Sequence, residues 1–271
     1  MICAGIDMGA RSIKVVLVKV ESGQPAQEVA RHQMFPEGLD MDVAAQQAYD
    51  EALQQAGLDG AQLQRVVATG VGRKQVGFAC DDVTEVAAGG RGAAFLFPAA
   101  RTVIDVGAEE ARALRLDASG RVLDFAANEK CAAGAGAFAE SMARALQLTL
   151  ADFGTASLMS TQAIPMNAQC TVFAESEVVS LIHAATPVPD IARAVLDAVA
   201  SRVCAMTRRA GIEDAVVLIG GMAHNPGFVR ALREALGVGE LWLPQAPEYV
   251  SALGAALIAA SIAAKEEGGG K

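Results

Sequence analysis

Residues 2–18 read ICAGIDMGARSIKVVLV and join two apolar runs through a polar turn that contains Asp7 and Gly9. An apolar run, a tight turn and a returning apolar run predict two buried strands that form a hairpin. Residues 102–116, TVIDVGAEEARALRL, repeat this pattern, and Asp105 follows Asp7 by 98 residues. Because this spacing has the size of a domain, the repeat predicts two similar halves.

Helical and strand patterns alternate along the rest of the chain. Apolar residues recur every three or four positions in residues 41–59 and again in a longer stretch, residues 191–211. Short apolar runs at residues 215–221 and 241–244 predict strands, and residues 248–264 predict a final helix. Strands that alternate with helices indicate the α/β class.

The repeat also suggests boundaries. We expect an N-terminal half over residues 1–98 and a C-terminal half over residues 99–248, with a cleft between them. The last helix, about residues 249–264, is expected to pack back on the first half. Residues 265–271, KEEGGGK, are expected to form a disordered tail.

Composition narrows the classes of partner. The chain has 271 residues, is 52% hydrophobic and carries a net charge of −9. This charge argues against a nucleic acid or an anionic membrane as a partner, because phosphate binding needs clustered lysine and arginine. An uncharged apolar run of about 18 residues, long enough to span a membrane, is absent from the sequence. The five cysteines form an odd, widely spaced set, so we expect a reduced, cytoplasmic protein.

Three glycine-containing segments suit phosphate chemistry. Gly9 and Gly107 follow the repeated aspartates, and glycine lets backbone N–H groups approach an anion. Asp7 and Asp105 can hold a hydrated Mg²⁺, which usually takes one or two carboxylates. The third segment, residues 218–227, reads LIGGMAHNPG and places two glycines between an expected strand and an expected helix. One Asp-Gly turn alone would indicate only a hairpin, whereas the three segments together favour a nucleotide site.

Two cysteines stand directly before predicted helices. Cys131 lies in NEKCAAGAGAF and Cys170 in MNAQCTVFAESEV. A helix start lowers the pKa of a thiol and favours negative charge. A [4Fe–4S] cluster needs four thiolates, so two chains would have to contribute two each. A buried, inert thiol is the simpler interpretation for Cys3 and Cys204, and Cys80 is more readily a surface or buried thiol than a ligand.

The ordered segments GIDMG, ATGVGR, VIDVG, CAAGAG, CTVFAESEV and GGMAHN resemble the BadF/BadG/BcrA/BcrD-type ATPases of the actin/Hsp70/hexokinase-like superfold. That family contains 2-hydroxyacyl-CoA dehydratase activators and benzoyl-CoA reductase ATPase subunits. The resemblance implies ATP or ADP with Mg²⁺ at Asp7 and Asp105. It also implies that Cys131 and Cys170 hold a [4Fe–4S] cluster shared with a second ATPase subunit. It implies nucleotide contacts by the following residues: Gly9, Ala10, Arg11, Ser12, Lys14, Gly107, Ala108, Gly220, Gly221 and Asn225.

Two positions depart from the family pattern. Ala10 stands where the family usually has serine or threonine. Residues 107–110 read Gly-Ala-Glu-Glu instead of Gly-Gly-Gln-Asp. Two carboxylates would repel a triphosphate unless Mg²⁺ or a nearby base intervenes. These departures suit one member of a pair of unequal subunits, and they favour the reductase.

We therefore expect an ATPase subunit of a benzoyl-CoA reductase type complex, which passes electrons from reduced ferredoxin to partner subunits that reduce a CoA thioester. The first alternative is a homodimeric activator of a 2-hydroxyacyl-CoA dehydratase. A small-molecule kinase of the same superfold would lack the cluster. Ala10 and the Gly-Ala-Glu-Glu loop also fit a regulatory pseudo-ATPase.

Overall fold

A computed structural model describes residues 1–36, 38, 40–128, 136–166 and 171–269. The chain divides into two compact units, and each is described here by itself. The first unit comprises Met1–Ala99, Ala118–Val122 and Glu248–Lys271, and the second comprises Ala100–Asp117 and Leu123–Pro247. The expected boundaries at residues 98 and 248 remain a prediction about where independent halves begin and end.

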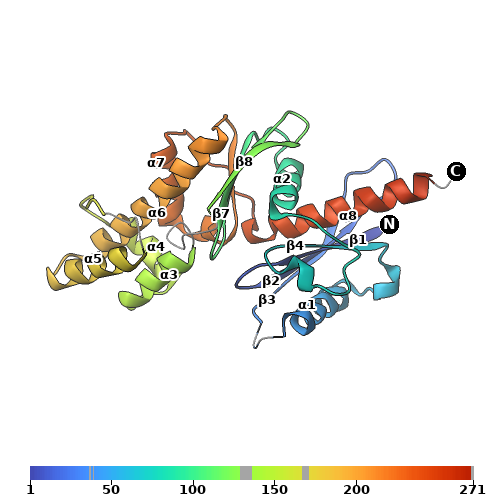
Figure 1. The fold of residues 1–271 in the computed structure, drawn as a ribbon, viewed down its shortest axis with the longest axis horizontal. Helices are drawn as coiled ribbons and strands as arrows, with labels where there is room; N and C mark the ends of the chain where they lie inside the picture. Colours follow the sequence, from blue (N-terminus) through green and yellow to red (C-terminus); the bar gives the residue numbers. More distant parts are fainter. Residues whose placement is uncertain (37, 39, 129–135, 167–170, 270–271) are drawn as a thin grey trace. The chain divides into compact units, whose positions relative to one another are not determined.

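The first unit is a five-stranded sheet with helices on both faces (Figure 1). The strand order is β3-β2-β1-β4-β5, in which β1 pairs antiparallel with β2 and parallel with β4. Its elements are β1 (Ile2–Met8), β2 (Ile13–Lys19), β3 (Gln27–Met34), α1 (Met41–Ala56), β4 (Arg65–Thr69), β5 (Asp81–Asp82), α2 (Glu85–Leu96) and α8 (Val250–Gly269).

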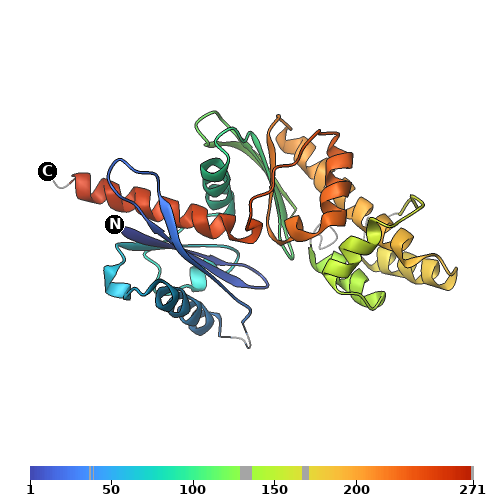
Figure 2. The same cartoon turned by 180° about the vertical axis from the view of Figure 1, so that it is seen from behind.

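Alternation along β1 decides which side chains meet which helix. Ala4 and Ile6 belong to the core under α1, whereas Cys3 belongs to the core under α8. Successive strand residues point to opposite faces, so one strand contributes to both cores. Figure 2 shows α8 and α1 on opposite sides of this sheet. The buried strands of the expected hairpin are thereby confirmed.

The helices α2 and α8 approach each other closely. A Cβ atom added to Gly254 would lie 1.8 Å from the carbonyl oxygen of Ala88, and one added to Gly92 would lie 2.1 Å from that of Val250. Only glycine permits this spacing. Because three glycines within one helix disfavour helix in isolation, the sequence pattern did not predict α2.

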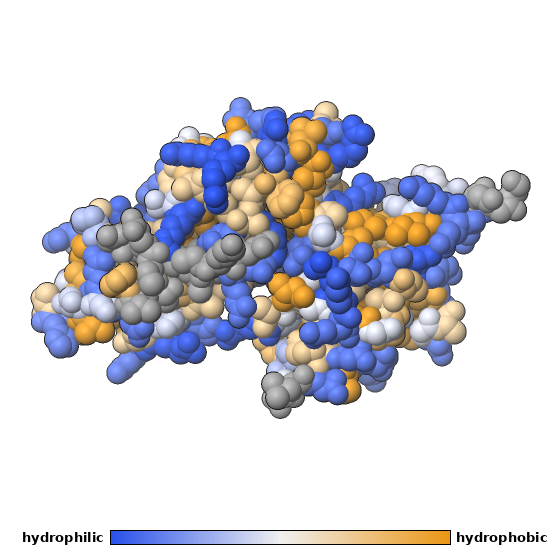
Figure 3. All heavy atoms as spheres, viewed as in Figure 1, coloured by the Kyte–Doolittle hydropathy of each residue, from blue (hydrophilic) through white to orange (hydrophobic). Residues whose placement is uncertain are grey.

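The stretch Pro247–Glu267 is long and apolar enough to cross a membrane by length and composition. However, 67% of its apolar window is buried inside the structure, where α8 packs against the sheet and α2. In Figure 3 the surface over α8 shows apolar atoms between hydrophilic groups. A core helix passes the same test, so this stretch is weak evidence for a span.

Two details of the sequence prediction were wrong. The helix α8 continues to Gly269, into the stretch expected to be a disordered tail, and Glu266 forms an ion pair with Arg65. Residues 241–244 do not form a strand, because Trp242 makes a single bridge with Val217. Contacts outside each local segment explain both differences.

The second unit repeats part of this plan. Its sheet has the order β8-β7-β6-β9, with β6 antiparallel to β7 and parallel to β9. Its elements are β6 (Thr102–Val106), β7 (Ala111–Leu116), β8 (Val122–Asn128, whose first residue belongs to the first unit), α3 (Gly136–Ala145), α4 (Leu150–Ser157), α5 (Thr171–His183), α6 (Val188–Ala210), β9 (Val216–Ile219) and α7 (Pro226–Leu236).

The long helix α6 organises this unit. The helices α3, α4, α5 and α7 all pack against it (Figure 1). Local signals set the bounds of α7: Asn225 caps its first turn, Pro226 occupies its first position, and Gly237 ends it with φ of 71°. These are the residues that helix starts and ends favour, so the expected helix is confirmed.

Candidate functional site

The first Asp-x-Gly turn joins β1 to β2. The amide of Gly9 donates to the carbonyl of Ser12 at 3.1 Å, which closes the turn. Asp7 and Lys14 are cross-strand partners, and Lys14 Nζ lies 3.4 Å from Asp7 Oδ2 and 3.3 Å from the Ser12 carbonyl oxygen. Both side chains are largely buried. The turn therefore presents a carboxylate and a cation beside a tight loop.

The second Asp-x-Gly turn has the same construction. The amide of Gly107 donates to the carbonyl of Glu110 at 2.9 Å, and Asp105 is the cross-strand partner of Arg112. Arg112 Nη1 lies 3.6 Å from Asp105 Oδ2, and the same guanidinium pairs with the Glu110 carboxylate. Arg112 thus supplies the neighbouring base that the acidic loop requires, while Glu109 is exposed.

A glycine stands against each aspartate from the neighbouring parallel strand. Gly70 follows β4 with φ of 92°, and a Cβ atom there would lie 2.6 Å from Asp7 Oδ1. Gly220 follows β9 with φ of 86°, and a Cβ atom there would also lie 2.6 Å from Asp105 Oδ1. Gly70 was missing from the predicted site residues. The signal that could have found it is a glycine directly after an apolar strand, as at Gly220.

The expected adenosine segment divides into residues of different kinds. A Cβ atom added to Gly221 would meet nothing within 4 Å, so this backbone is open. Asn225 is buried, and its Oδ1 accepts from the Phe228 amide at 2.9 Å while its Nδ2 donates to the Leu150 carbonyl at 3.1 Å. Asn225 therefore caps α7 and ties it to α4, which positions the segment.

The remaining residues of the first loop differ in exposure. Ala10 and Arg11 are exposed, whereas Ser12 is 4% exposed. Gln33 Nε2 donates to the Ser12 hydroxyl at 3.0 Å. Gln33 lies on β3 and was not predicted as a site residue. Its hydrogen bond holds Ser12 in place, and no short sequence motif signals it.

The residues Cys131 and Cys170 lie outside the described part of the chain. The helices expected after them are present: α5 begins at Thr171, the next residue after Cys170, and α3 begins at Gly136. A helix start stabilises negative charge, so this order of cysteine and helix fits thiolate ligands.

Asp190 supports the chain segment that leads toward Cys170. It is 2% exposed and accepts from the Ser160 hydroxyl at 2.8 Å and from the amides of Thr161 and Gln162 at 2.9 and 3.1 Å. The Ser160 hydrogen bond, assisted by these amides, holds the pKa of Asp190 below its usual range. Sequence patterns did not identify this residue, because its partners lie near 160.

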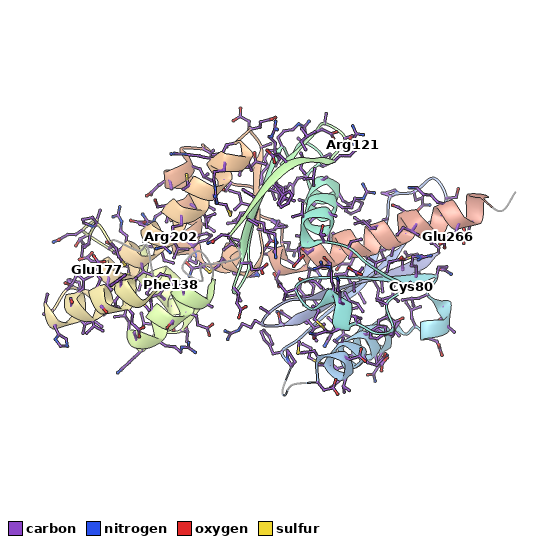
Figure 4. All side chains as sticks on the ribbon, in the orientation of Figure 1. Cys80, Arg121, Phe138, Glu177, Arg202 and Glu266 are labelled. Carbon is purple, nitrogen blue, oxygen red and sulfur yellow. The ribbon has the colours of Figure 1, made fainter. Side chains whose placement is uncertain are left out.

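The other cysteines match their simple interpretation. Cys3 and Cys204 are buried, and Cys204 Sγ contacts the Ala235 carbonyl oxygen at 3.1 Å. Burial raises the pKa of the Cys3 thiol. Cys80 is exposed in the first unit and is labelled in Figure 4. Among the described residues, no group of three or more His, Cys, Asp or Glu could hold a metal ion.

Each unit thus carries a buried aspartate, a basic partner, a tight turn and a glycine pressed against the carboxylate. This duplicated α/β arrangement defines an actin/Hsp70/hexokinase-like fold. A ROK family glucokinase from Streptomyces griseus shares the fold, with a TM-score of 0.59 at 13% identity over 96% of this chain and 100% of that one.

The chain belongs to the BadF/BadG/BcrA/BcrD ATPase family, whose model matches residues 4–259. It is 39% identical to an activator of lactoyl-CoA dehydratase from Anaerotignum propionicum, over 98% of this chain and 100% of the relative. It is 35% identical to the (R)-2-hydroxyglutaryl-CoA dehydratase activating ATPase of Acidaminococcus fermentans, over 96% and 98%. The activator of 2-hydroxyisocaproyl-CoA dehydratase from Clostridium difficile, solved with bound ADPNP, has a TM-score of 0.91 at 33% identity, covering 100% and 98%.

The expectation of a benzoyl-CoA reductase ATPase subunit was wrong. One polypeptide of the benzoyl-CoA reductase from Thauera aromatica is 31% identical over 94% of this chain and 92% of its own length, below the dehydratase activators. The expectation relied on the acidic loop at residues 107–110 as a mark of unequal subunits. The structure removes that argument, because Arg112 neutralises Glu110 within the same turn.

Proposed function

We propose that this protein is an ATP-dependent activator of a 2-hydroxyacyl-CoA dehydratase and works as a homodimer. The observation that carries the proposal is similarity over nearly the whole chain to activators of such dehydratases, in sequence and in fold. The duplicated Asp-x-Gly turns supply local chemistry of the required kind. The particular 2-hydroxyacyl-CoA is left open by this proposal.

The nucleotide is proposed to use the two turns and the open backbone at Gly221. Turn amides and the cations of Lys14 and Arg112 suit phosphate oxygens. Asp7 and Asp105 suit a hydrated Mg²⁺, which takes few protein ligands. Since Arg112 offsets the acidic loop, the proposal includes hydrolysis of ATP as well as its binding.

The proposed redox group is a [4Fe–4S] cluster held by Cys131 and Cys170 from each of two copies. Such a cluster needs four thiolates and carries one electron at a time. The chain's own part is to present two thiolates at the starts of α3 and α5. Reduced ferredoxin is the proposed donor, and the dehydratase component is the proposed acceptor.

Anaerobic purification tests this function. We expect a brown protein with about four iron and four sulfide per dimer, as one shared cluster requires. Cys131→Ser and Cys170→Ser should lose the colour, whereas Cys80→Ser, at an exposed cysteine in the first unit, should keep it. ADPNP binding, measured by calorimetry, should survive all three changes.

Activation of a dehydratase component is the decisive measurement. The protein, ATP and reduced ferredoxin together should start dehydration of a 2-hydroxyacyl-CoA by a purified activator-free dehydratase. A colourless protein with all five cysteines intact would refute the redox role. A brown protein that activates none of the lactoyl-, 2-hydroxyglutaryl- and 2-hydroxyisocaproyl-CoA dehydratases would refute the assigned acceptor.

A further inference from the structure

The first two residues of α3 are bonded to the second Asp-x-Gly turn. The amide of Gly136 donates to the carbonyl of Gly107 at 2.8 Å, and the amide of Ala137 donates to the carbonyl of Ala108 at 2.7 Å. The first amides of a helix have no partner within the helix, so an outside acceptor holds them. We call these two hydrogen bonds the turn–α3 contact.

Gly136 also contacts the third glycine-containing segment. A Cβ atom added to Gly136 would lie 3.1 Å from the Gly107 carbonyl oxygen, 3.2 Å from Met222 Cγ and 3.3 Å from Met222 Sδ. Met222 directly follows Gly221. The first residue of α3 is therefore packed between two segments of the proposed nucleotide site.

The rest of α3 is fixed to the core of its unit. Phe138 and Met142 are fully buried in the cluster that includes Val195 and Val199 of α6. Figure 4 labels Phe138 on α3 and Arg202 on α6. Close-packed interiors transmit displacement because they do not deform continuously. A shift at the turn would thus move α3 as a body, and the covalently attached segment with Cys131 precedes α3 directly.

We propose that the turn–α3 contact couples nucleotide binding to the position of α3, so that Gly136 and Ala137 are positioning residues between the second turn and the segment that carries Cys131. This inference rests on the proposed function, since it requires a nucleotide at the turn. It names the contact through which that nucleotide acts on the cysteine segment.

Two substitutions weaken the contact in different ways. Gly136→Ala adds a methyl group where 3.1 and 3.2 Å separate it from its neighbours, so the turn or Met222 must yield by a few tenths of an ångström. Ala137→Pro removes the N–H group that donates to Ala108. Proline is tolerated in the first turn of a helix, so α3 can still form.

Each substitution has a matched control. Gly239→Ala adds the same methyl group where nothing lies within 4 Å. Val86→Pro places proline at the second position of α2, which is the position of Ala137 in α3, and both residues are half-buried. Circular dichroism checks that every variant keeps its helices.

Hydrogen–deuterium exchange of the amides of residues 138–145 reads the coupling directly, with ADPNP as the probe and without use of the cluster. ADPNP should change their exchange at least about threefold in the unchanged protein and in both controls. The change should fall below about half of that in Gly136→Ala and Ala137→Pro, while calorimetry shows that ADPNP still binds.

Three outcomes overturn the inference. If ADPNP binds the unchanged protein and leaves α3 exchange as it was, the coupling is absent and the proposed function stands. If both α3 variants keep the full exchange change, the coupling uses other contacts. If ADPNP does not bind the unchanged protein at all, the proposed function fails and the inference fails with it.

Discussion

Replacing Gly220 by alanine, and separately replacing Gly221, adds one methyl group at adjacent positions with opposite surroundings. Gly220 has φ of 86° and ψ of 169°, a backbone region that is essentially restricted to glycine. A Cβ atom there would lie 2.5 Å from the Val106 carbonyl oxygen and 2.6 Å from Asp105 Oδ1. At Gly221 a Cβ atom would meet nothing within 4 Å.

The expected loss of stability follows from these two observations. Forcing alanine into the conformation of Gly220 costs about 1–3 kcal/mol. Overpacking a close-packed site costs about 1–3 kcal/mol more, so the free energy of unfolding should fall by about 2–6 kcal/mol. For Gly221→Ala we expect a change within about 0.5 kcal/mol, as for other open surface positions.

The fluorescence of Trp242, the one tryptophan of the sequence, reports this region during urea unfolding. Its backbone pairs with Val216 and Leu218 of β9, the strand that ends before Gly220. Under the proposed function, Gly221→Ala should weaken ADPNP binding without a loss of stability, because the methyl group occupies open backbone. Equal urea midpoints for the two variants would refute the assignment of Gly220 to packing.

Three further predictions concern stability and reactivity. Asp190→Asn should destabilise the fold at pH 7 and progressively less below pH of about 4, because the lowered pKa of Asp190 stabilises the fold above its ordinary value and that contribution is lost on acidification; urea unfolding at both pH values checks the sign, and a constant difference would contradict it. Iodoacetamide should label Cys80 in the native protein long before Cys3, as peptide mass spectrometry can show, since the first thiol is exposed and the second is buried with a raised pKa; equal rates would contradict this. Gly254→Ala should lower the free energy of unfolding by about 1–3 kcal/mol or more through its clash with the Ala88 carbonyl, and an unchanged thermal midpoint would show that the helices can separate at little cost.

Local patterns predicted the elements that local chemistry dictates. The hairpins at residues 2–18 and 102–116 needed only apolar runs and a glycine turn, and α7 needed only its cap, proline and terminal glycine. The prediction failed where a distant partner decides. Residues 85–96 form α2 because their glycines admit α8, and residues 241–244 make a bridge to β9 instead of a strand.

The function followed the same division. The motifs identified the family, since its segments are short and contiguous. The choice of the reductase over the activator relied on the acidic loop, read without its neighbours. Arg112 stands two positions after Glu110, yet only the folded turn shows that its guanidinium reaches both Glu110 and Asp105.

The sequence by itself determined the α/β class, the duplicated Asp-x-Gly turns, the helices that follow Cys131 and Cys170, and the family. The tertiary structure decided which group faces which: Gly70 and Gly220 against the two aspartates, Gln33 on Ser12, and Gly136 between Gly107 and Met222. Hydrogen-bond geometry and close packing depend on atoms brought together from distant parts of the chain, and such pairings leave no periodic pattern in the residues that form them.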